Sequence, residues 1–128
     1  MTGLSKIAVI AGNDGGLRMQ LARWLAGFGI DSVHVATEDE ARGLVDRLNP
    51  DLIFLTAGAG TPDILGFVAR TVRLRGTGET RVMLCSRAGD AALLGAAVAE
   101  GADECLVAPF DADLLRFKLE QTGVLAWQ

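Results

Sequence analysis

The first stretch that could bind a ligand is the glycine-rich segment at positions 12–16, Gly-Asn-Asp-Gly-Gly, which follows an apolar run. Asp14 could act as a metal ligand, because Mg²⁺ prefers carboxylate oxygens. The glycines could instead cradle a phosphate at the start of a helix. The segment does not match G-x-G-x-x-G and has no Walker lysine. A tight turn with a solvated acid is therefore the favoured interpretation.

Possible nucleophiles come next. Thr56 ends the run 52–55, but a hydroxyl is a weak nucleophile unless a base lies beside it. Cys85 and Cys105 fall on neighbouring predicted strands and could form a redox pair. Two small core residues are the favoured reading, since free cysteine is commonly buried. His34 is expected on a distant strand, which disfavours a Cys–His catalytic pair.

Arginine side chains form the last group. Arg70, Arg73 and Arg75, with Arg81 soon after, gather near the end of a predicted helix. Cations there complement the helix dipole, and this is the favoured explanation. The alternative is an anion or nucleotide site, because the guanidinium fork suits phosphate groups.

The composition narrows the class of protein. With 128 residues, the chain is expected to form one domain, 1–128, with its core at about 6–122 and a fraying tail at 123–128. A net charge of −4 argues against general nucleic-acid binding. No apolar run is long enough to span a membrane, and no leader pattern is visible, so a cytoplasmic location is expected. The cysteines and the histidine show no zinc spacing, and no metal or cofactor is expected.

Five apolar runs alternate with five helical patterns. Strands are expected at 7–10, 32–36, 51–56, 81–86 and 104–108. Helices are expected to begin near Leu17 and at the caps Thr37, Thr61, Asp90 and Asp111. Such alternation predicts an α/β protein with a parallel sheet covered on both faces. The number of elements fits a flavodoxin-like (βα)5 three-layer sandwich with a five-stranded sheet in the order 2-1-3-4-5.

The order of these segments resembles the receiver domain of bacterial two-component response regulators (CheY-like). The resemblance covers about 6–122 and rests on the segments 6–10, 50–55, 101–104 and 108–111. The last of these, Ala-Pro-Phe-Asp, is similar to the family's Lys-Pro-Phe turn. By analogy with that turn, the Ala108–Pro109 peptide bond is expected to be cis.

In receivers an Asp ending the third strand accepts a phosphoryl group. Two acids after the first strand bind Mg²⁺, and a hydroxyl and a lysine end the fourth and fifth strands. The resemblance places Thr56 at the acceptor and Ala108 at the lysine position. The acid pair falls on Ala11 and Gly12, or on Gly12 and Asn13; the hydroxyl falls on Cys85 with Ser86 beside it; and the family's switching aromatic falls on Cys105. The resemblance thus implies a vestigial phosphorylation site.

The function expected from this resemblance is that of a degenerate receiver, a phosphorylation-independent interaction module without enzymatic activity. Its expected partner is another protein or a second copy of the chain. The predicted fourth helix has no charged residue between Asp90 and Glu100, which makes it a candidate for a covered face. The alternative, which stays equally open, is that its alanines form a mild surface that needs no partner. The expected contact residues on helix 4, strand 5 and helix 5 are Leu93, Ala96, Glu100, Cys105, Arg116 and Phe117.

Two alternatives remain open. One is a sensor of a nucleotide or cyclic dinucleotide that uses Arg70, Arg73 and Arg75. The other, a flavodoxin-like enzyme, is weaker, because the expected crevice offers no convincing acid, base or cofactor loop.

Overall fold

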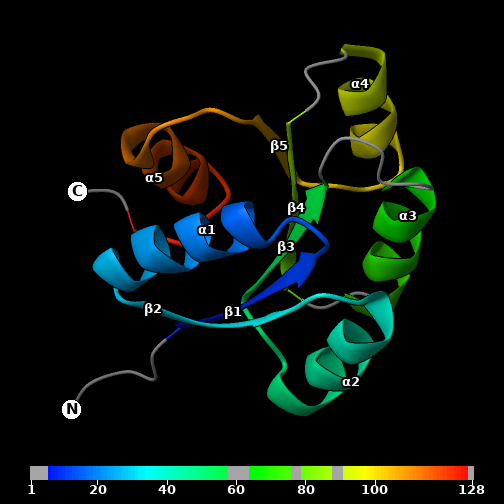
Figure 1. Cartoon of the computed structure of the whole chain (residues 1–128), viewed down its shortest axis with the longest axis horizontal. Helices are drawn as coiled ribbons and strands as arrows, with labels where there is room; N and C mark the ends of the chain where they lie inside the picture. The colour runs from blue at the N-terminus through cyan, green and yellow to red at the C-terminus, as the bar shows by residue number, and fades with distance from the viewer. Residues whose placement is uncertain (1–5, 58–63, 76–78, 88–90, 127–128) are drawn as a thin grey trace.

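A computed structural model describes residues 6–57, 64–75, 79–87 and 91–126 of the chain (Figure 1). Strands and helices alternate along the described sequence, as expected. The strands are β1 (Lys6–Gly12), β2 (Ile30–Val35), β3 (Leu52–Ala57), β4 (Arg81–Ser86) and β5 (Glu104–Val107). The helices are α1 (Gly15–Gly27), α2 (Glu38–Leu48), α3 (Ile64–Arg75), α4 (Ala91–Ala99) and α5 (Ala112–Gln121).

All strand pairs are parallel, and the sheet order is β2-β1-β3-β4-β5. The helices α1 and α5 cover one face, and α2, α3 and α4 cover the other (Figure 1). This confirms the predicted flavodoxin-like architecture. The strand β2 begins two residues earlier than expected, because Ile30 is buried and pairs with Lys6 of β1.

The strand β3 is buried on both faces, which explains its unbroken apolar run. Phe54 packs into the core under α1 and α5, whereas Ile53 and Leu55 pack into the core under α2, α3 and α4. Because β3 contributes side chains to both cores, its carboxyl end lies packed on both faces at the centre of the sheet.

Two aspartates fasten the amino ends of neighbouring strands. The Asp51 carboxylate accepts a hydrogen bond from the Ile7 amide at 2.9 Å, while the Asp51 amide donates to the Ile7 carbonyl. Asp103 repeats the arrangement on Val82, with bonds of 2.8 and 2.7 Å. Each aspartate stands just before its own strand and accepts from the amide of the second residue of the strand beside it. These clasps help fix the register of the sheet at that end.

Side-chain caps begin three of the described helices: Asp14 for α1, Thr37 for α2 and Asp111 for α5. Thr37 and Asp111 accept hydrogen bonds from the amides of Glu40 and Leu114, which confirms both predicted caps. The sequence Thr37-Glu38-Asp39-Glu40 has the pattern of a capping box, in which the Glu40 carboxylate would accept from a backbone amide. In the structure this carboxylate accepts from the Thr37 hydroxyl instead. The predicted caps Thr61 and Asp90 lie outside the described residues.

The C-terminal segment does not fray where the structure describes it. Val124 is only 4% exposed, and its amide and that of Leu125 both donate to the Leu119 carbonyl. The expectation of a loose tail from residue 123 is therefore wrong as far as Leu125, because an apolar side chain there completes the core beneath α5. The predicted cis bond between Ala108 and Pro109 is confirmed.

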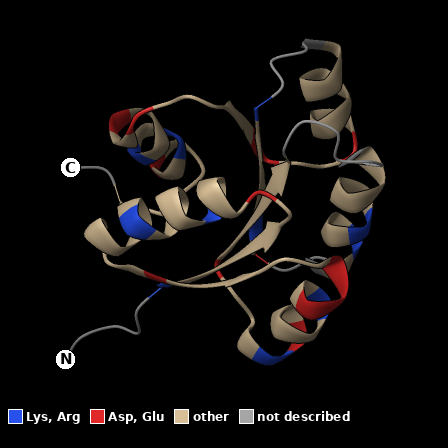
Figure 2. Ribbon diagram, in the orientation of Figure 1, with Lys and Arg blue, Asp and Glu red and all other residues tan. Residues whose placement is uncertain are grey.

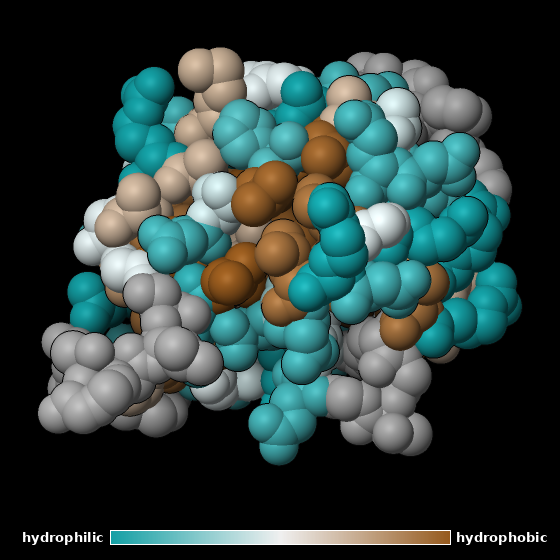
Figure 3. Space-filling view, turned by 90° about the horizontal axis from the view of Figure 1, so that it is seen from below, coloured by the Kyte–Doolittle hydropathy of each residue, from teal (hydrophilic) through white to brown (hydrophobic). Residues whose placement is uncertain are grey.

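The surface differs from element to element. In Figure 2, the ribbon of α2 is coloured for charged residues along its length, whereas that of α4 carries no charged residue. Seen from below, toward the β2 edge, the molecule shows a group of apolar side chains ringed by hydrophilic ones (Figure 3). Val33 of β2 is one of the exposed large apolar residues. In the described part of the chain, no helix is long and apolar enough to cross a membrane.

Candidate functional site at the carboxyl ends of the strands

Strand register brings most of the predicted vestigial site together. Gly12 of β1 is paired with Thr56 of β3, and Thr56 is paired with Cys85 of β4. The Ala108 amide, just beyond β5, donates to the Ser86 carbonyl at 2.8 Å. In open parallel sheets, ligands bind in the crevice beyond these strand ends. These strand-end residues therefore lie together at one edge of the sheet, and whether they form a functional site stays a prediction.

Thr56 and Gly12 fill the centre of this edge. The Thr56 side chain is buried, 1% exposed, and its hydroxyl donates to the Ala11 carbonyl at 3.2 Å. Gly12 has a φ of +136°, a conformation that side chains with a Cβ rarely adopt. A Cβ at this position would overlap both the carbonyl oxygen and the hydroxyl of Thr56. The structure thus leaves no room for an acid at Gly12, the position that both alignments of the predicted acid pair share.

The remaining strand-end groups are also covered. Cys85 is fully buried, and burial raises the pKa of its thiol. Cys105 is half-buried, and partial burial raises its pKa as well. Cys85 packs on the α1–α5 side and Cys105 on the opposite side, so the thiols do not face each other. The cysteines therefore fit the reading of small core residues, and His34 lies exposed on β2.

Asp14 has a role that the sequence interpretation missed. One carboxylate oxygen caps α1 by accepting from the Leu17 amide at 3.0 Å, and the other accepts from Arg87 Nε at 2.6 Å. The hydrogen bond from Arg87 holds the pKa of Asp14 below its ordinary value. Asp14 precedes the buried Leu17 by three residues, which is a recognisable cap pattern. Its arginine partner lies 73 residues away and left no local signal.

Two arginines bring positive charge to the same edge. Arg87 follows β4 and is held by Asp14, while Arg18 of α1 donates to the Gly12 carbonyl through Nη1. Among the described residues, no cluster of three or more His, Cys, Asp or Glu side chains could hold a metal ion. The edge as described is thus built from hydroxyl, backbone and guanidinium groups, with Asp14 already engaged by Arg87 and the α1 amides.

The predicted contact residues do not all share one face. Leu93 and Ala96 of α4 are partly exposed, Glu100 is exposed just beyond α4, and Cys105 lies beneath the helix with its Sγ 3.9 Å from the Leu94 carbonyl. On α5, Phe117 is exposed and Lys118 pairs with Glu104 of β5 at 3.3 Å.

Arg116 lies on the other flank of α5. Its guanidinium is 5.7 Å from the centre of the Phe28 ring, next to α1. The inclusion of Arg116 in the α4–β5–α5 face is therefore corrected. A rotation of about 100° per residue separates it from Lys118 by more than half a turn.

The predicted arginine cluster on α3 is only partly available. Arg70 reaches across to α2, where its guanidinium binds Glu38 through Nε and Nη2, the latter at 2.8 Å. Arg73 is exposed, and the side chain of Arg75 lies outside the described residues. An anion at this point would have to compete with Glu38 for Arg70.

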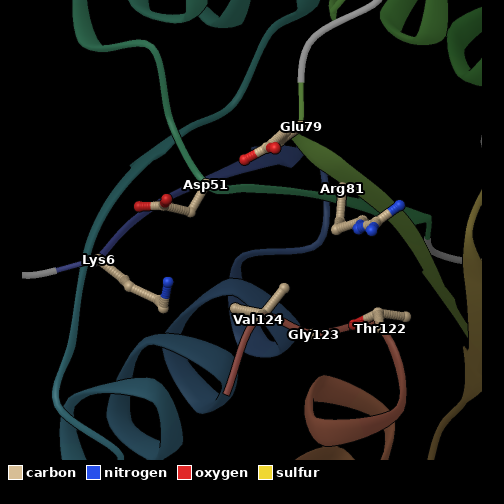
Figure 4. A pocket seen from close by; sticks show the side chains of 7 residues that line it. All are labelled: Lys6, Asp51, Glu79, Arg81, Thr122, Gly123 and Val124. Atoms are coloured by element: carbon tan, nitrogen blue, oxygen red, sulfur yellow. The ribbon is translucent and has the colours of Figure 1, made fainter. Parts of the chain in front are cut away.

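A polar groove of about 240 Å³ lies at the amino end of the sheet, opposite the candidate site. Figure 4 shows Asp51 and Glu79 on one side, Lys6 and Arg81 at its two ends, and the turn after α5 on the other side. Asp51 is engaged by the Ile7 amide, and Arg81 lies 3.8 Å from Asp103. Two of the groove's charged groups thus serve the fold.

A second cavity, of about 340 Å³, borders the candidate site between α1 and the segment after β5. It is lined by Gly16, Leu17, Gln20, Trp24, Arg87, Ala108, Pro109 and Phe110. The rings of Trp24 and Phe110 are in contact, with centroids 5.6 Å apart. The sequence interpretation did not anticipate this cavity, because its walls come from three separate segments.

Comparison with known proteins identifies the fold. No protein-family model and no curated protein sequence matches this chain. A response regulator from Thermotoga maritima superposes with a TM-score of 0.83 at 20% identity, covering 95% of this chain and 100% of its own. A two-component response regulator from Clostridium difficile gives a TM-score of 0.80 at 18% identity, covering 93% and 96%.

HP1043, an orphan response regulator of H. pylori, gives a TM-score of 0.76 at 18% identity, covering 92% of this chain and 96% of its own. The chain thus has the fold of response regulator receiver domains. At these identities the likeness establishes the fold alone.

Proposed function

We propose that the chain is a receiver-type module that signals without phosphorylation, by binding another protein or a second copy of itself in a bacterial, cytoplasmic pathway. It has no enzymatic activity of its own. The observation that carries this proposal is the contact between Thr56 and Gly12. A buried threonine occupies the acceptor position, and the glycine opposite it cannot become an acid without displacing the end of β3.

The chemistry of phosphotransfer supports the same conclusion. An acyl phosphate forms only on a carboxylate nucleophile. The charge of the phosphoryl group is balanced by Mg²⁺, and the protein must hold this ion with oxygen ligands. The acceptor position holds a hydroxyl that donates to the Ala11 carbonyl, and the lysine position holds Ala108. Arg87, after β4, is a cation near this edge, and Asp14 engages its Nε and Nη2.

The direct test is incubation of the purified chain with acetyl phosphate and Mg²⁺, followed by intact-mass measurement. We expect no phosphorylated species, and no change in the amide NMR spectrum on addition of beryllofluoride with Mg²⁺. A phosphate on any residue, or a saturable beryllofluoride response, would refute the proposal. A receiver with an intact acid pair, treated in parallel, establishes that the reagents are active.

The proposed contact surface is the face formed by α4, β5 and the Leu114–Phe117–Lys118 flank of α5. The helix α4 is uncharged, and Val98 is 53% exposed on it. Phe117 is 43% exposed on α5. Exposed apolar side chains on two elements that flank one strand form the kind of surface that a partner covers.

Charge substitutions on this face test the interaction. Val98→Glu and Phe117→Glu should each abolish self-association in sedimentation velocity, or binding to a purified partner protein in calorimetry. Val33→Glu is the matched control, because it places the same charge on an exposed valine of the β2 edge. Equal loss of binding in the control, or full binding in both test variants, would show that another surface is used.

The second function expected from the sequence, nucleotide sensing through α3, requires Arg70 to exchange Glu38 for a phosphate. Calorimetry against nucleotides and cyclic dinucleotides tests it. Saturable binding that disappears in Arg73→Ala would favour this sensor over the interaction module.

A further inference from the structure

The cavity between α1 and the segment after β5 has the composition of a small-molecule site. Its volume of about 340 Å³ lies within the range that small ligands occupy in proteins. Leu17, Trp24, Pro109 and Phe110 supply apolar walls, and Gln20 and Arg87 supply polar groups. An apolar cavity with a few convergent polar groups is the usual form of a ligand site.

The polar groups retain hydrogen-bonding capacity toward the cavity. Arg87 binds Asp14 through Nε and Nη2, at 2.6 and 3.3 Å. Its Nη1 makes no hydrogen bond to any residue that the structure describes. The Gln20 amide is likewise without a hydrogen-bond partner in the described part of the chain. A ligand could therefore use both groups without breaking an existing contact.

The ion pair fixes Arg87 at the edge of the cavity. Asp14 is itself held by the Leu17 amide of α1, so Arg87 bridges the end of β4 and the start of α1. Its Nη2 would lie 3.4 Å from a Cβ placed on Gly16, which shows how closely the guanidinium covers the first turn. A preorganised guanidinium suits a planar anion, because it presents parallel N–H groups in a rigid plane.

We propose that this cavity binds a small aromatic carboxylate, with the carboxylate on Arg87 and Gln20 and the ring against Trp24 and Phe110. The aromatic walls favour a planar apolar body, and the N–H groups that Arg87 does not use on Asp14 favour a carboxylate acceptor. The site lies beside the vestigial phosphorylation site but uses none of its strand-end side chains except Ala108. It is independent of the contact face proposed on α4 and α5.

Titration with naphthoate and with its uncharged amide tests the site. By NMR, naphthoate should shift the Trp24 indole N–H and the Gln20 side-chain amide saturably, with a dissociation constant on the order of 1 mM or tighter. The amide analogue should bind roughly tenfold more weakly, because it cannot form the charge-assisted pair. Absence of saturable shifts well above that concentration, or equal binding of acid and amide, would overturn the proposal.

Three variants locate the binding. Arg87→Met should weaken naphthoate binding roughly tenfold, whereas Arg47→Met removes an exposed arginine from α2 and should leave it unchanged. Gln20→Trp keeps Arg87 but fills the cavity, and it should block binding. Circular dichroism of each variant verifies the fold. Unchanged binding in both Arg87→Met and Gln20→Trp would assign the ligand to a different surface and refute the proposed site.

Discussion

Gly12 and Thr56 determine the character of the candidate site through a contact that neither residue reveals alone. The glycine adopts a φ of +136°, and the threonine lies where a Cβ on that glycine would project. The two residues are 44 positions apart and meet because β1 and β3 pair in this register. A change at either position therefore acts on the other.

Gly12→Ala should lower the free energy of unfolding by about 2–4 kcal/mol, because it adds backbone strain to a steric overlap. Gly43→Ala is the matched control, since Gly43 lies in α2 with open space around its Cβ position. There the same change should stabilise the protein by up to about 1 kcal/mol. Urea unfolding of both variants measures the difference, and a neutral effect at Gly12 would contradict the packing described here.

The ion pair between Asp14 and Arg87 should make stability depend on pH in a defined direction. The pKa of Asp14 is lowered in the folded state, so its contribution is complete above the unfolded carboxyl pKa of about 4. It is lost as the pH falls through the lower folded pKa. The stability difference between the native protein and Arg87→Met should hence be constant from neutral pH to about pH 5 and shrink below about pH 4.

Urea unfolding across this pH range measures the difference. Arg47→Met, which removes an arginine that no carboxylate pairs with in the described ion pairs, should give a nearly flat difference. A gap that widens as the pH falls would show that Asp14 is not held ionised by Arg87.

At the scale of elements, single side chains that accept hydrogen bonds from backbone amides help to set where strands and helices begin. Asp103 satisfies the amide of the buried Val82, so Asp103→Ala leaves that N–H without its acceptor. The expected cost is about 1–3 kcal/mol in the free energy of unfolding. Hydrogen exchange at the Val82 amide should also become faster than in the native protein.

Asp31→Ala, on the exposed surface of β2, is the control and should change neither quantity. If the Val82 amide stayed protected in Asp103→Ala, the clasp would not be the interaction that holds the start of β4.

Elements were predictable where the determining signal is local. The caps at Thr37 and Asp111 are read from the residues that follow them, and the run at 52–55 marks a strand buried on both faces. The early start of β2 was missed, because Ile30 follows a glycine and joins the sheet only through Lys6. Val124 was assigned to a loose tail because its burial also depends on residues distant in sequence, those of the core beneath α5.

Site residues were predictable as positions but not as contacts. The strand ends that carry Gly12, Thr56 and Ser86 fall together as expected, because their order follows from the fold. The pairs Arg87–Asp14 and Arg70–Glu38 join residues far apart in sequence and could not be inferred from spacing. The side of α5 on which Arg116 lies was not evident from the sequence, because it is revealed by the contacts of Arg116 with Phe28 and of Lys118 with Glu104.

At the scale of the whole molecule, four strand ends together make up the candidate site. Introducing a phosphoacceptor there therefore requires more than a nucleophile. Thr56→Asp combined with Ala108→Lys supplies a carboxylate and a cation, but β1 still ends in Gly12 with no room for an acid. We expect this double variant to take up no phosphate from acetyl phosphate and Mg²⁺.

Stability gives an independent reading of the same coupling. Thr56→Asp alone places a carboxylate at a position that is 1% exposed, and burial raises the pKa of such a group. The free energy of unfolding should fall by about 3 kcal/mol at pH 7, and part of that loss should be recovered toward pH 4, where the acid is protonated. Thr122→Asp, near the end of α5, is the control for the chemical change at a less buried threonine.

Mg²⁺-dependent phosphorylation of the double variant Thr56→Asp/Ala108→Lys would contradict the expectation of no uptake. It would show that the end of β1 can supply metal ligands, and that the packing of Gly12 against Thr56 does not prevent the chemistry.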